Sequence, residues 1–310
     1  MKKANQTNKI VLGCVCAALT EGLYGISYLF TKQITEIIDP FELLGWRFLF
    51  AFAFMQVLVM VGVLKVNFKG RKIVSLLKIA TFHPVLYYIA ETFGIKYTTA
   101  SESGAFISCV PVVTLLVSAL LLKKKPTKAQ TCGILVTLFG VLICMAAAGI
   151  RMSFSVAGYL WLTIAVFSFS LYSVFAEKAE DFNSVEKTYI MLLSGVLVFA
   201  PAALIRHLCK GTARELLTLL FTSGTTITAF LYLGIVCSVL AMMLYNTAIQ
   251  NIGNNRAASF VGVTTVVSVL SGTLVLHESM SLLQAIGIVL IIGGVYVANQ
   301  RSLSTANEKE

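Results

Sequence analysis

The sequence predicts an all-α integral membrane protein with ten transmembrane helices arranged as two inverted five-helix repeats. The first observation is composition: 57% of the 310 residues are hydrophobic, 12% are charged, and the mean hydropathy is +0.86. Soluble domains are about 45 to 50% apolar and about a quarter charged. The second is a series of apolar runs about twenty residues long, the length that crosses a hydrocarbon core of roughly 30 Å. The third is an internal similarity between the two halves of the chain.

The apolar runs follow one another along the whole chain with short connections. In the first half they cover approximately 10–31, 41–63, 73–95, 100–122 and 129–149, and in the second half 155–176, 187–206, 225–249, 256–276 and 281–299. The first run follows the basic segment MKKANQTNK, but it is long, contains Glu21 and lacks a small-residue cleavage site. We therefore expect a retained helix rather than a signal peptide. The short connections leave no room for a soluble catalytic domain.

The placement of charge predicts the topology. The net charge is +10, and most of the 24 Lys and Arg residues fall on one side if the N-terminus is cytoplasmic. Cytoplasmic loops of membrane proteins carry an excess of Lys and Arg. We therefore expect both termini in the cytoplasm, and we assign the basic charge to topology rather than to nucleic-acid binding. The segment RHLCKGTARE opposes the rule.

An internal repeat connects the two halves. Shifting the sequence by 154 residues lays 91–141 over 245–295 without a gap, and QxxG followed by GV recurs in the fifth run of each half. An odd number of spans in each copy makes the second copy enter the membrane from the opposite side. Inverted repeats are typical of secondary transporters, whose substrate site lies near the midplane. We expect repeats at 1–150 and 151–310, the second with a short cytoplasmic tail, and a carrier rather than a channel or an intramembrane enzyme.

Four motifs resemble the EamA-type family of the drug/metabolite transporter superfamily. They are LYGISYLFTK with Tyr24 in place of a family Trp, DPFELLGWRFLFA, KYTTASESGAFISCVPVVTLL, and HESMSLLQAIGIVLIIGGV. The second copy has Glu278 where the first copy has Lys124. This departure from the family pattern argues against a role for the acid that both copies share. The resemblance implies a carrier that exports small metabolites, amino acids or their relatives first among them. A broad-spectrum drug/metabolite carrier and an uptake permease are the alternatives.

A polar stripe runs through the segment HPVLYYIAET. His83, Tyr87 and Glu91 are spaced i, i+4 and i+8, so they drift only about 80° around a helix axis, and Tyr88 lies beside them. Pro84 removes a backbone donor and can kink the helix. An ionisable side chain in hydrocarbon costs about 2.5 to 3.5 kcal/mol, so the stripe should face a cavity. We predict that these four residues bind substrate, while the alternative makes Tyr and His interfacial anchors.

A second stripe lies on the first apolar run, where Glu21, Tyr24, Tyr28 and Lys32 share one helix face. Tyr24 and Tyr28 are candidates for substrate binding. Burial disfavours the charged form of a carboxyl group, and no basic residue lies within one turn of Glu21, so Glu21 is the candidate for proton coupling. Lys32 and Arg47 are expected in structural or gating roles, and either could form a salt bridge with Glu91.

The second half supplies fewer candidates. Tyr172, Tyr245 and Asn246 are predicted to bind substrate, because they occupy counterparts of the polar positions of the first half. Pro111 is predicted to be structural or gating, and the glycines of the fifth runs are predicted to let helices pack closely.

Several protein classes are disfavoured by missing motifs. The chain has no Walker motif, and HESMS lacks the second histidine of HExxH. The seven cysteines form no CxxC pair, so we expect them to pack as small apolar residues. We therefore expect a transporter rather than an enzyme, with no metal or cofactor. Its partners should be a small-molecule substrate and the lipid bilayer, and it should be a monomer or a weak dimer.

Overall fold

Reciprocal hydrogen bonds at the first turn fix where two of the longest helices begin. Helix α2 (Pro40–Met60) starts after Asp39, whose side chain accepts from Phe41 N at 2.9 Å while Glu42 accepts from Asp39 N. Helix α9 (Ser184–Lys210) starts in the same way with Asn183 and Glu186, at 2.9 and 3.0 Å. This capping box satisfies first-turn backbone donors that have no partner within the helix.

The same device begins α7 (Lys128–Ala147) and α15 (Leu282–Asn307). Thr127 and Gln130 exchange two bonds of 3.0 and 3.2 Å, and Ser281 and Gln284 exchange two of 2.8 and 3.2 Å. The two pairs are related by the shift of 154 residues that aligns the halves. The glutamine of each QxxG motif is therefore a helix cap.

The computed structural model describes residues 2–35, 37–98, 103, 106–147, 155–212, 224–275 and 281–307. These residues form helices and turns, with no strand among them. The remaining helices are α1 (Lys2–Thr35), α3 (Val74–Ala80), α4 (Tyr87–Tyr97), α6 (Val110–Leu121), α8 (Val156–Lys178), α11 (Gly224–Leu231), α12 (Met242–Ile252), α13 (Asn254–Ser259) and α14 (Gly262–Val275). A kinked segment, η1 (Thr81–Leu86), joins α3 to α4, and a π-helical segment, η3 (Tyr232–Ala241), joins α11 to α12.

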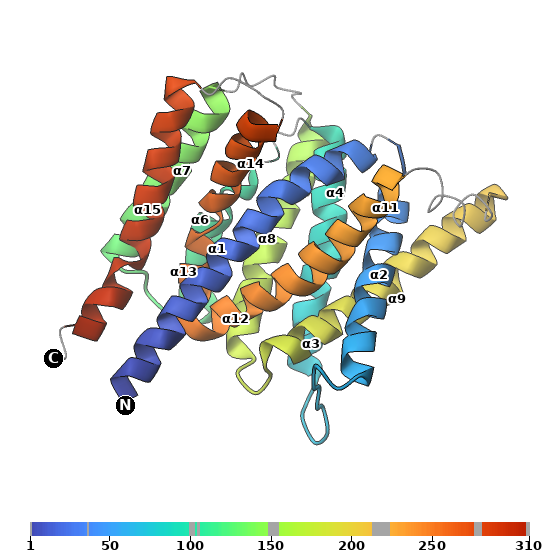
Figure 1. Ribbon diagram of the computed structural model, residues 1–310, viewed down its shortest axis with the longest axis horizontal. Coiled ribbons are helices and arrows are strands. Elements are labelled where there is room, and N and C mark those ends of the chain that lie inside the picture. Colours follow the sequence, from blue (N-terminus) through green and yellow to red (C-terminus); the bar gives the residue numbers. More distant parts are fainter. Residues whose placement is uncertain are drawn as a thin grey trace.

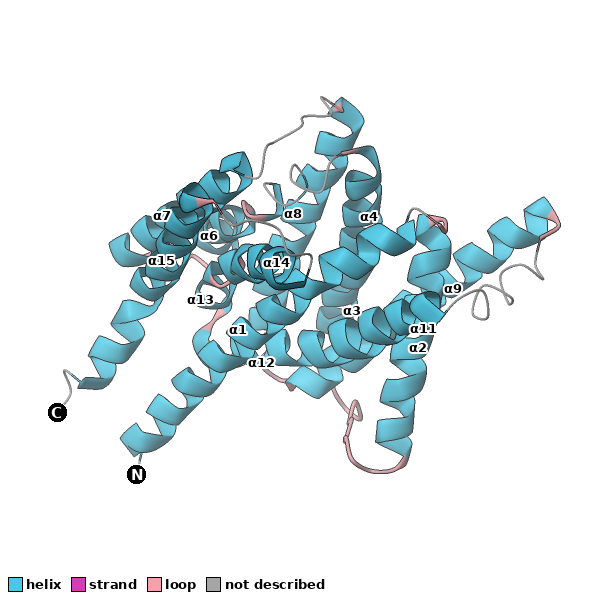
Figure 2. Ribbon diagram, turned by 45° about the horizontal axis from the view of Figure 1, so that its top comes forward, coloured by secondary structure: helices cyan, strands magenta, loops and turns pink. Residues whose placement is uncertain are grey.

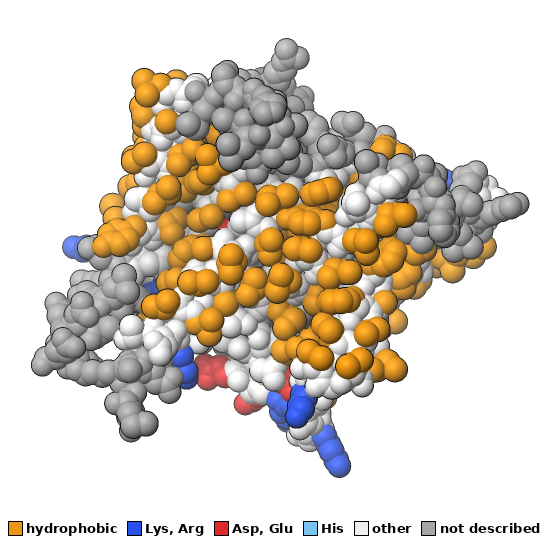
Figure 3. All heavy atoms as spheres, viewed as in Figure 1, with side chains coloured by type: hydrophobic (Ala, Val, Ile, Leu, Met, Phe, Trp, Pro, Cys, Tyr) orange, Lys and Arg blue, Asp and Glu red, His pale blue; other side chains and the backbone are white. Residues whose placement is uncertain are grey.

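The all-α membrane class is confirmed. Within the described ranges, seven helices are long and apolar enough to cross a membrane, and α6 is a shorter apolar helix. Hydrophobic side chains cover much of the face shown in Figure 3, and charged ones gather at the end where the loop 61–73 lies. The expected third span is divided into α3, η1 and α4, and the expected ninth into α13 and α14.

The break in the third span follows from Pro84, as the sequence predicts. His83 has φ −144° and ψ 115°, which is outside the helical region, and Pro84 follows it inside η1. Proline cannot donate to the helical ladder, and its ring clashes with the preceding turn. His83, Tyr87 and Tyr88 are buried beside this break.

Helices α7 and α15 pack backbone against backbone, side by side at one edge of the molecule (Figure 1). A Cβ atom added to Gly133 would lie 2.4 Å from Ala298 N, and one added to Gly294 would lie 2.6 Å from Gly133 O. Gly140 and Gly287 meet in the same way, since a Cβ added to either would lie 2.7 Å from the other's carbonyl oxygen. The predicted close packing is confirmed for these four glycines and is wrong for Gly293, where an added Cβ would meet nothing within 4 Å. The shift of 154 residues exchanges one glycine contact for the other.

Helices α2 and α9 form a second antiparallel pair, and side-chain contacts stabilise this region at both ends of the pair. At one end Glu42 contacts His207 at 2.7 Å, and at the other Glu186 pairs with Arg71. Helix α1 runs diagonally past this pair and packs beside α12 and α14 (Figure 2). Both described chain ends lie on the same side of the molecule (Figure 1).

Candidate functional site

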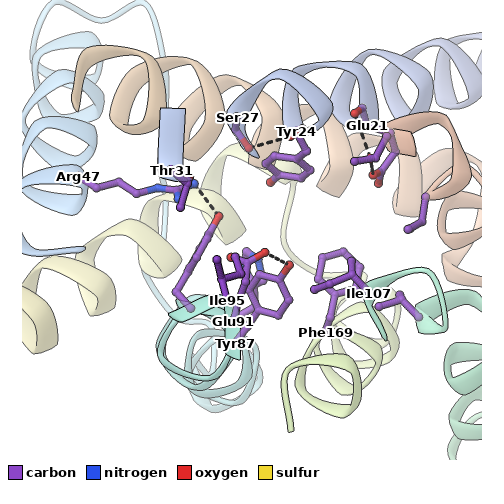
Figure 4. Close-up of a pocket in the computed structure, with 15 residues that line it drawn as sticks. Glu21, Tyr24, Ser27, Thr31, Arg47, Tyr87, Glu91, Ile95, Ile107 and Phe169 are labelled. Carbon is purple, nitrogen blue, oxygen red and sulfur yellow. Dashed lines mark hydrogen bonds between the residues drawn. The ribbon is translucent and has the colours of Figure 1, made fainter. Parts of the chain in front are cut away.

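A buried cavity lies where α1, α2, α4, α8 and α14 converge (Figure 4). Its volume is about 50 Å³, which is room for a few water molecules. A metabolite therefore needs the walls to separate before it can bind. The lining residues are Glu21, Tyr24, Ser27, Thr31, Arg47, His83, Tyr87, Tyr88, Glu91, Ile95, Ile107, Val110, Phe169, Val261 and Thr264.

The guanidinium of Arg47 enters one end of the cavity from α2. It is 4% exposed and donates from Nε to Ser238 Oγ at 2.8 Å and from Nη2 to the Tyr88 hydroxyl at 2.9 Å. Its Cζ also lies 4.3 Å from the centre of the Tyr88 ring, a cation–π contact. The close approach of η3 depends on Gly234, where a Cβ would lie 2.9 Å from Arg47 O. Both hydrogen-bond partners are neutral, so the charge of Arg47 is not cancelled by an ion pair within the described part of the chain.

Glu91 lies on α4 and accepts a 2.7 Å hydrogen bond from the Tyr87 hydroxyl. The interpretation of Glu91 as the salt-bridge partner of Arg47 is wrong, because Arg47 turns to Tyr88 and Ser238 instead. The charges of Glu91 and Arg47 still interact across a longer distance.

Glu21 lies at the other end of the cavity, where α1 crosses α14. A Cβ on Gly25 would be 2.8 Å from Thr264 O, so this crossing needs glycine. It brings the Thr264 hydroxyl 2.8 Å from Glu21 Oε2. The second carboxyl oxygen, Oε1, is buried and has no hydrogen-bond partner among the described residues.

His83 is enclosed by aromatic rings. Its ring centre lies 4.6 Å from that of Tyr172, 4.9 Å from Tyr87, 5.1 Å from Tyr88 and 5.6 Å from Phe169. Its Nδ1 atom is buried, with no hydrogen-bond partner in the part of the chain that the structure describes. The predicted stripe of His83, Tyr87, Tyr88 and Glu91 therefore does line one cavity.

Three predicted binding residues do not line this cavity. The Tyr172 hydroxyl donates to Asn246 Oδ1 at 3.0 Å, and Asn246 Nδ2 donates to Thr188 Oγ1 at 3.1 Å, in a fully buried network. Tyr245 packs against Phe169, with ring centres 5.3 Å apart. The substrate-binding role of Tyr172, Tyr245 and Asn246 stays a prediction, and in this structure their buried contacts support the wall of the cavity.

Three other predicted residues remain. The side chains of Tyr28 and Lys32 lie outside the described residues, although both belong to α1. Pro111 is in the first turn of α6, where a missing backbone donor costs nothing. This position gives Pro111 a structural role at the start of the helix.

The sequence prediction missed several lining residues. Ser27 and Thr31 fall on the same side of α1 as Tyr24, and this spacing could have identified them. Phe169 and Thr264 come from the second half of the chain, and no local pattern places them beside α1 or α4.

The cavity therefore combines one cation, two carboxyl groups and several aromatic faces. Such a set can bind a small molecule that carries both charges, and aromatic faces can hold its apolar or cationic parts. The described residues contain no cluster of His, Cys, Asp or Glu that could hold a metal ion.

Comparison with known proteins indicates transport. The profile of the EamA-like transporter family matches residues 9–146 and 156–300. An uncharacterized transporter of Bacillus subtilis (strain 168), YcxC, is 30% identical over 92% of this chain and 92% of its own. A protein of Escherichia coli (strain K12) named as a probable amino-acid metabolite efflux pump is 23% identical over 91% of this chain and 93% of its own. The names of these relatives point to transport rather than catalysis.

One solved crystal structure has a similar fold. It aligns with a TM-score of 0.69 at 19% sequence identity and covers 96% of this chain and 99% of its own. At this identity the similarity concerns the fold alone.

Proposed function

Because this chain belongs to the EamA-like transporter family, we propose that it is a secondary transporter that exports small metabolites, amino acids or related compounds, by alternating access. The observation that carries the proposal is Arg47, a buried cation with neutral hydrogen-bond partners in a cavity that also contains Glu91 and Glu21. A substrate carboxylate would pair with Arg47, and its ammonium group would pair with Glu91. The name of the Escherichia coli relative supports the same substrate class.

We propose that the chain crosses the bacterial cytoplasmic membrane ten times, as inverted repeats at 1–150 and 151–310, with both termini in the cytoplasm. Three features support the repeat: the matched caps of α7 and α15, their exchanged glycine contacts, and irregular helical segments at corresponding positions. A shift of 154 residues lays the kinked segment η1 inside the π-helical segment η3. Reporter fusions after Glu36, Arg151 and His277 should report outside, and fusions after Lys69, Lys125 and Glu180 inside. An inside signal after Arg151 would contradict the inverted arrangement.

We propose that Glu21 couples export to protons. A coupling group must reach the cavity and must tolerate both protonation states, and Glu21 has one carboxyl oxygen bonded to Thr264 and one without a partner among the described residues. In reconstituted vesicles with an imposed pH gradient, Glu21→Gln should abolish net export driven by the gradient but leave some substrate exchange. Exchange survives because it does not require the proton site to be reset. Wild-type export that ignores the gradient would contradict proton coupling.

The function is tested by comparing extracellular metabolites of cells with and without expression. Compounds that accumulate outside are then tested for counterflow in vesicles that contain the purified protein as a monomer or weak dimer. Counterflow identifies a carrier, whereas flux without counterflow identifies a channel. A covalently changed product identifies an enzyme, and depletion of medium compounds identifies an uptake permease. Export of many unrelated compounds would favour the broad-spectrum carrier.

A further inference from the structure

The charged groups of the cavity occupy different places along its length. Figure 4 shows Arg47 entering from one end and Glu21 from the other, with Tyr24 between them on the α1 side and Glu91 below. Arg47 donates to Tyr88, and Glu91 lies one helical turn after Tyr88 on α4, whereas Glu21 contacts Thr264 at the crossing of α1 and α14. The cavity therefore has one end with groups of both charges, called the paired end although they form no direct ion pair, and a separate acidic end.

The head group of an α-amino acid fits only the paired end. Its ammonium and carboxylate groups are attached to one carbon atom, so their charges must be met by two protein groups that lie near each other. Arg47 and Glu91 meet this condition. The substrate side chain must then extend along the cavity toward Glu21, past the apolar walls that Phe169 and Ile107 provide.

The group at the end of the substrate side chain determines whether Glu21 Oε1 gains a hydrogen-bond donor. Glu21 is 3% exposed, and its Oε1 has no hydrogen-bond partner among the described residues. An apolar group placed there would bury an unpaired carboxyl oxygen, which is unfavourable. A cationic group would supply both a donor and the opposite charge. With Glu21 and Glu91 ionised, Arg47 leaves one negative charge in the cavity, and a substrate with one net positive charge cancels it.

On the basis of the proposed function, we infer that this transporter prefers amino acids whose side chain ends in a cation, such as lysine, ornithine and arginine, and that Glu21 is the residue that selects them. The aliphatic stem of such a side chain packs against the apolar wall while its end meets Glu21. Glu91 and Arg47 serve every α-amino acid alike, because they contact only the head group.

The test compares lysine with norleucine, which has the same carbon chain without the terminal ammonium group. Exchange of each compound is measured by counterflow in vesicles that contain the full chain. Wild type should prefer lysine by about tenfold or more, the range expected for one charged hydrogen bond. Glu21→Gln should bring this ratio near one. Glu91→Gln is the matched control and should weaken both substrates while it keeps the ratio.

A second variant protects the test if Glu21→Gln does not fold. Glu21→Asp keeps the charge but sets the carboxylate back by one methylene group. The longer side chain of arginine can still reach it, whereas that of ornithine cannot, so the ratio of arginine to ornithine exchange should rise. Wild-type exchange of norleucine as good as that of lysine would overturn the inference and leave the proposed function standing. An unchanged arginine-to-ornithine ratio in Glu21→Asp would also overturn it. Failure of wild type to exchange any amino acid would overturn the proposed function itself.

Discussion

The seam between α7 and α15 and the wall of the cavity are built in opposite ways. In the seam four glycines bring backbone to backbone, with no room for even one added carbon at Gly133 or Gly294. In the cavity wall the backbone is interrupted by η1, and charged and aromatic side chains meet by hydrogen bonds and ring contacts. Backbone atoms in direct contact at glycine leave the two helices little freedom to shift, whereas hydroxyl groups and rings can change contact partners. We therefore expect the seam to stay intact during transport and the cavity wall to rearrange.

The largest effect should come from filling the seam. Gly133→Leu adds a side chain whose first atom would lie 2.4 Å from Ala298 N, so the two helices must separate. Overpacking of this kind costs about 1 to 3 kcal/mol, and more when backbone must move. We expect a marked loss of folded protein in fluorescence-detected size-exclusion chromatography and a lower melting temperature of the remainder.

Gly293→Ala is the matched control for the seam. It neighbours Gly294 on α15, but an added Cβ would meet nothing within 4 Å. The variant should be made and melt like wild type. Equal damage from both substitutions would mean that glycine matters here through helix geometry rather than through close contact, and the contrast with the cavity would fail.

The next effect should come from the cation of the cavity. Arg47→Gln keeps a hydrogen-bonding group near Tyr88 and Ser238 but removes the positive charge. Exchange of an amino acid should fall by about tenfold or more, because a charged hydrogen bond to its carboxylate is lost. A decarboxylated analogue of the same substrate serves as the comparison and should lose less. Equal losses for both compounds would show that Arg47 supports the fold instead of binding a carboxylate.

Substitutions of two tyrosines should distinguish residues that line the cavity from residues that support its wall. Tyr87→Phe removes the donor to Glu91 in the cavity and should weaken apparent substrate affinity by about two- to tenfold, with little change in melting temperature. Tyr172→Phe leaves Asn246 Oδ1 buried without its donor and should lower stability by about 1 to 3 kcal/mol while affinity is kept. The reverse result, a stable Tyr172→Phe with altered affinity, would return Tyr172 to the binding surface.

The smallest effects should come from the caps of the seam helices. Thr127→Ala and Ser281→Ala each remove a hydroxyl that accepts from the backbone of a glutamine three residues later. Each should cost about 0.5 to 2 kcal/mol in thermal unfolding, and the two costs should be similar because the sites are repeat counterparts. A large difference between the two variants would show that the caps are alike in geometry but not in environment.

The membrane class and the helical segments follow from the sequence by itself. Hydrophobic runs specify spans because the bilayer leaves backbone groups no partner outside a helix. The kink at Pro84 is local and was predicted from the sequence. The caps at Gln130 and Gln284 are equally local, but the sequence analysis used these glutamines only as evidence for the repeat. The stripe from His83 to Glu91 was also predictable, since helix periodicity alone places those residues on one face.

Only the tertiary structure decided which side chains meet across the bundle. Arg47 was one of two candidate salt-bridge partners of Glu91, yet it bonds to Tyr88 and to Ser238, which lies 191 positions further along the chain. Glu21 meets Thr264, which is 243 positions away. Tyr172 was predicted to bind substrate from its position in the repeat, and in this structure its ring stacks against His83, which lines the cavity. Periodicity fixes positions on one helix, whereas the crossing and rotation of neighbouring helices depend on contacts such as those at Gly25 and Gly234, which involve residues far apart in sequence.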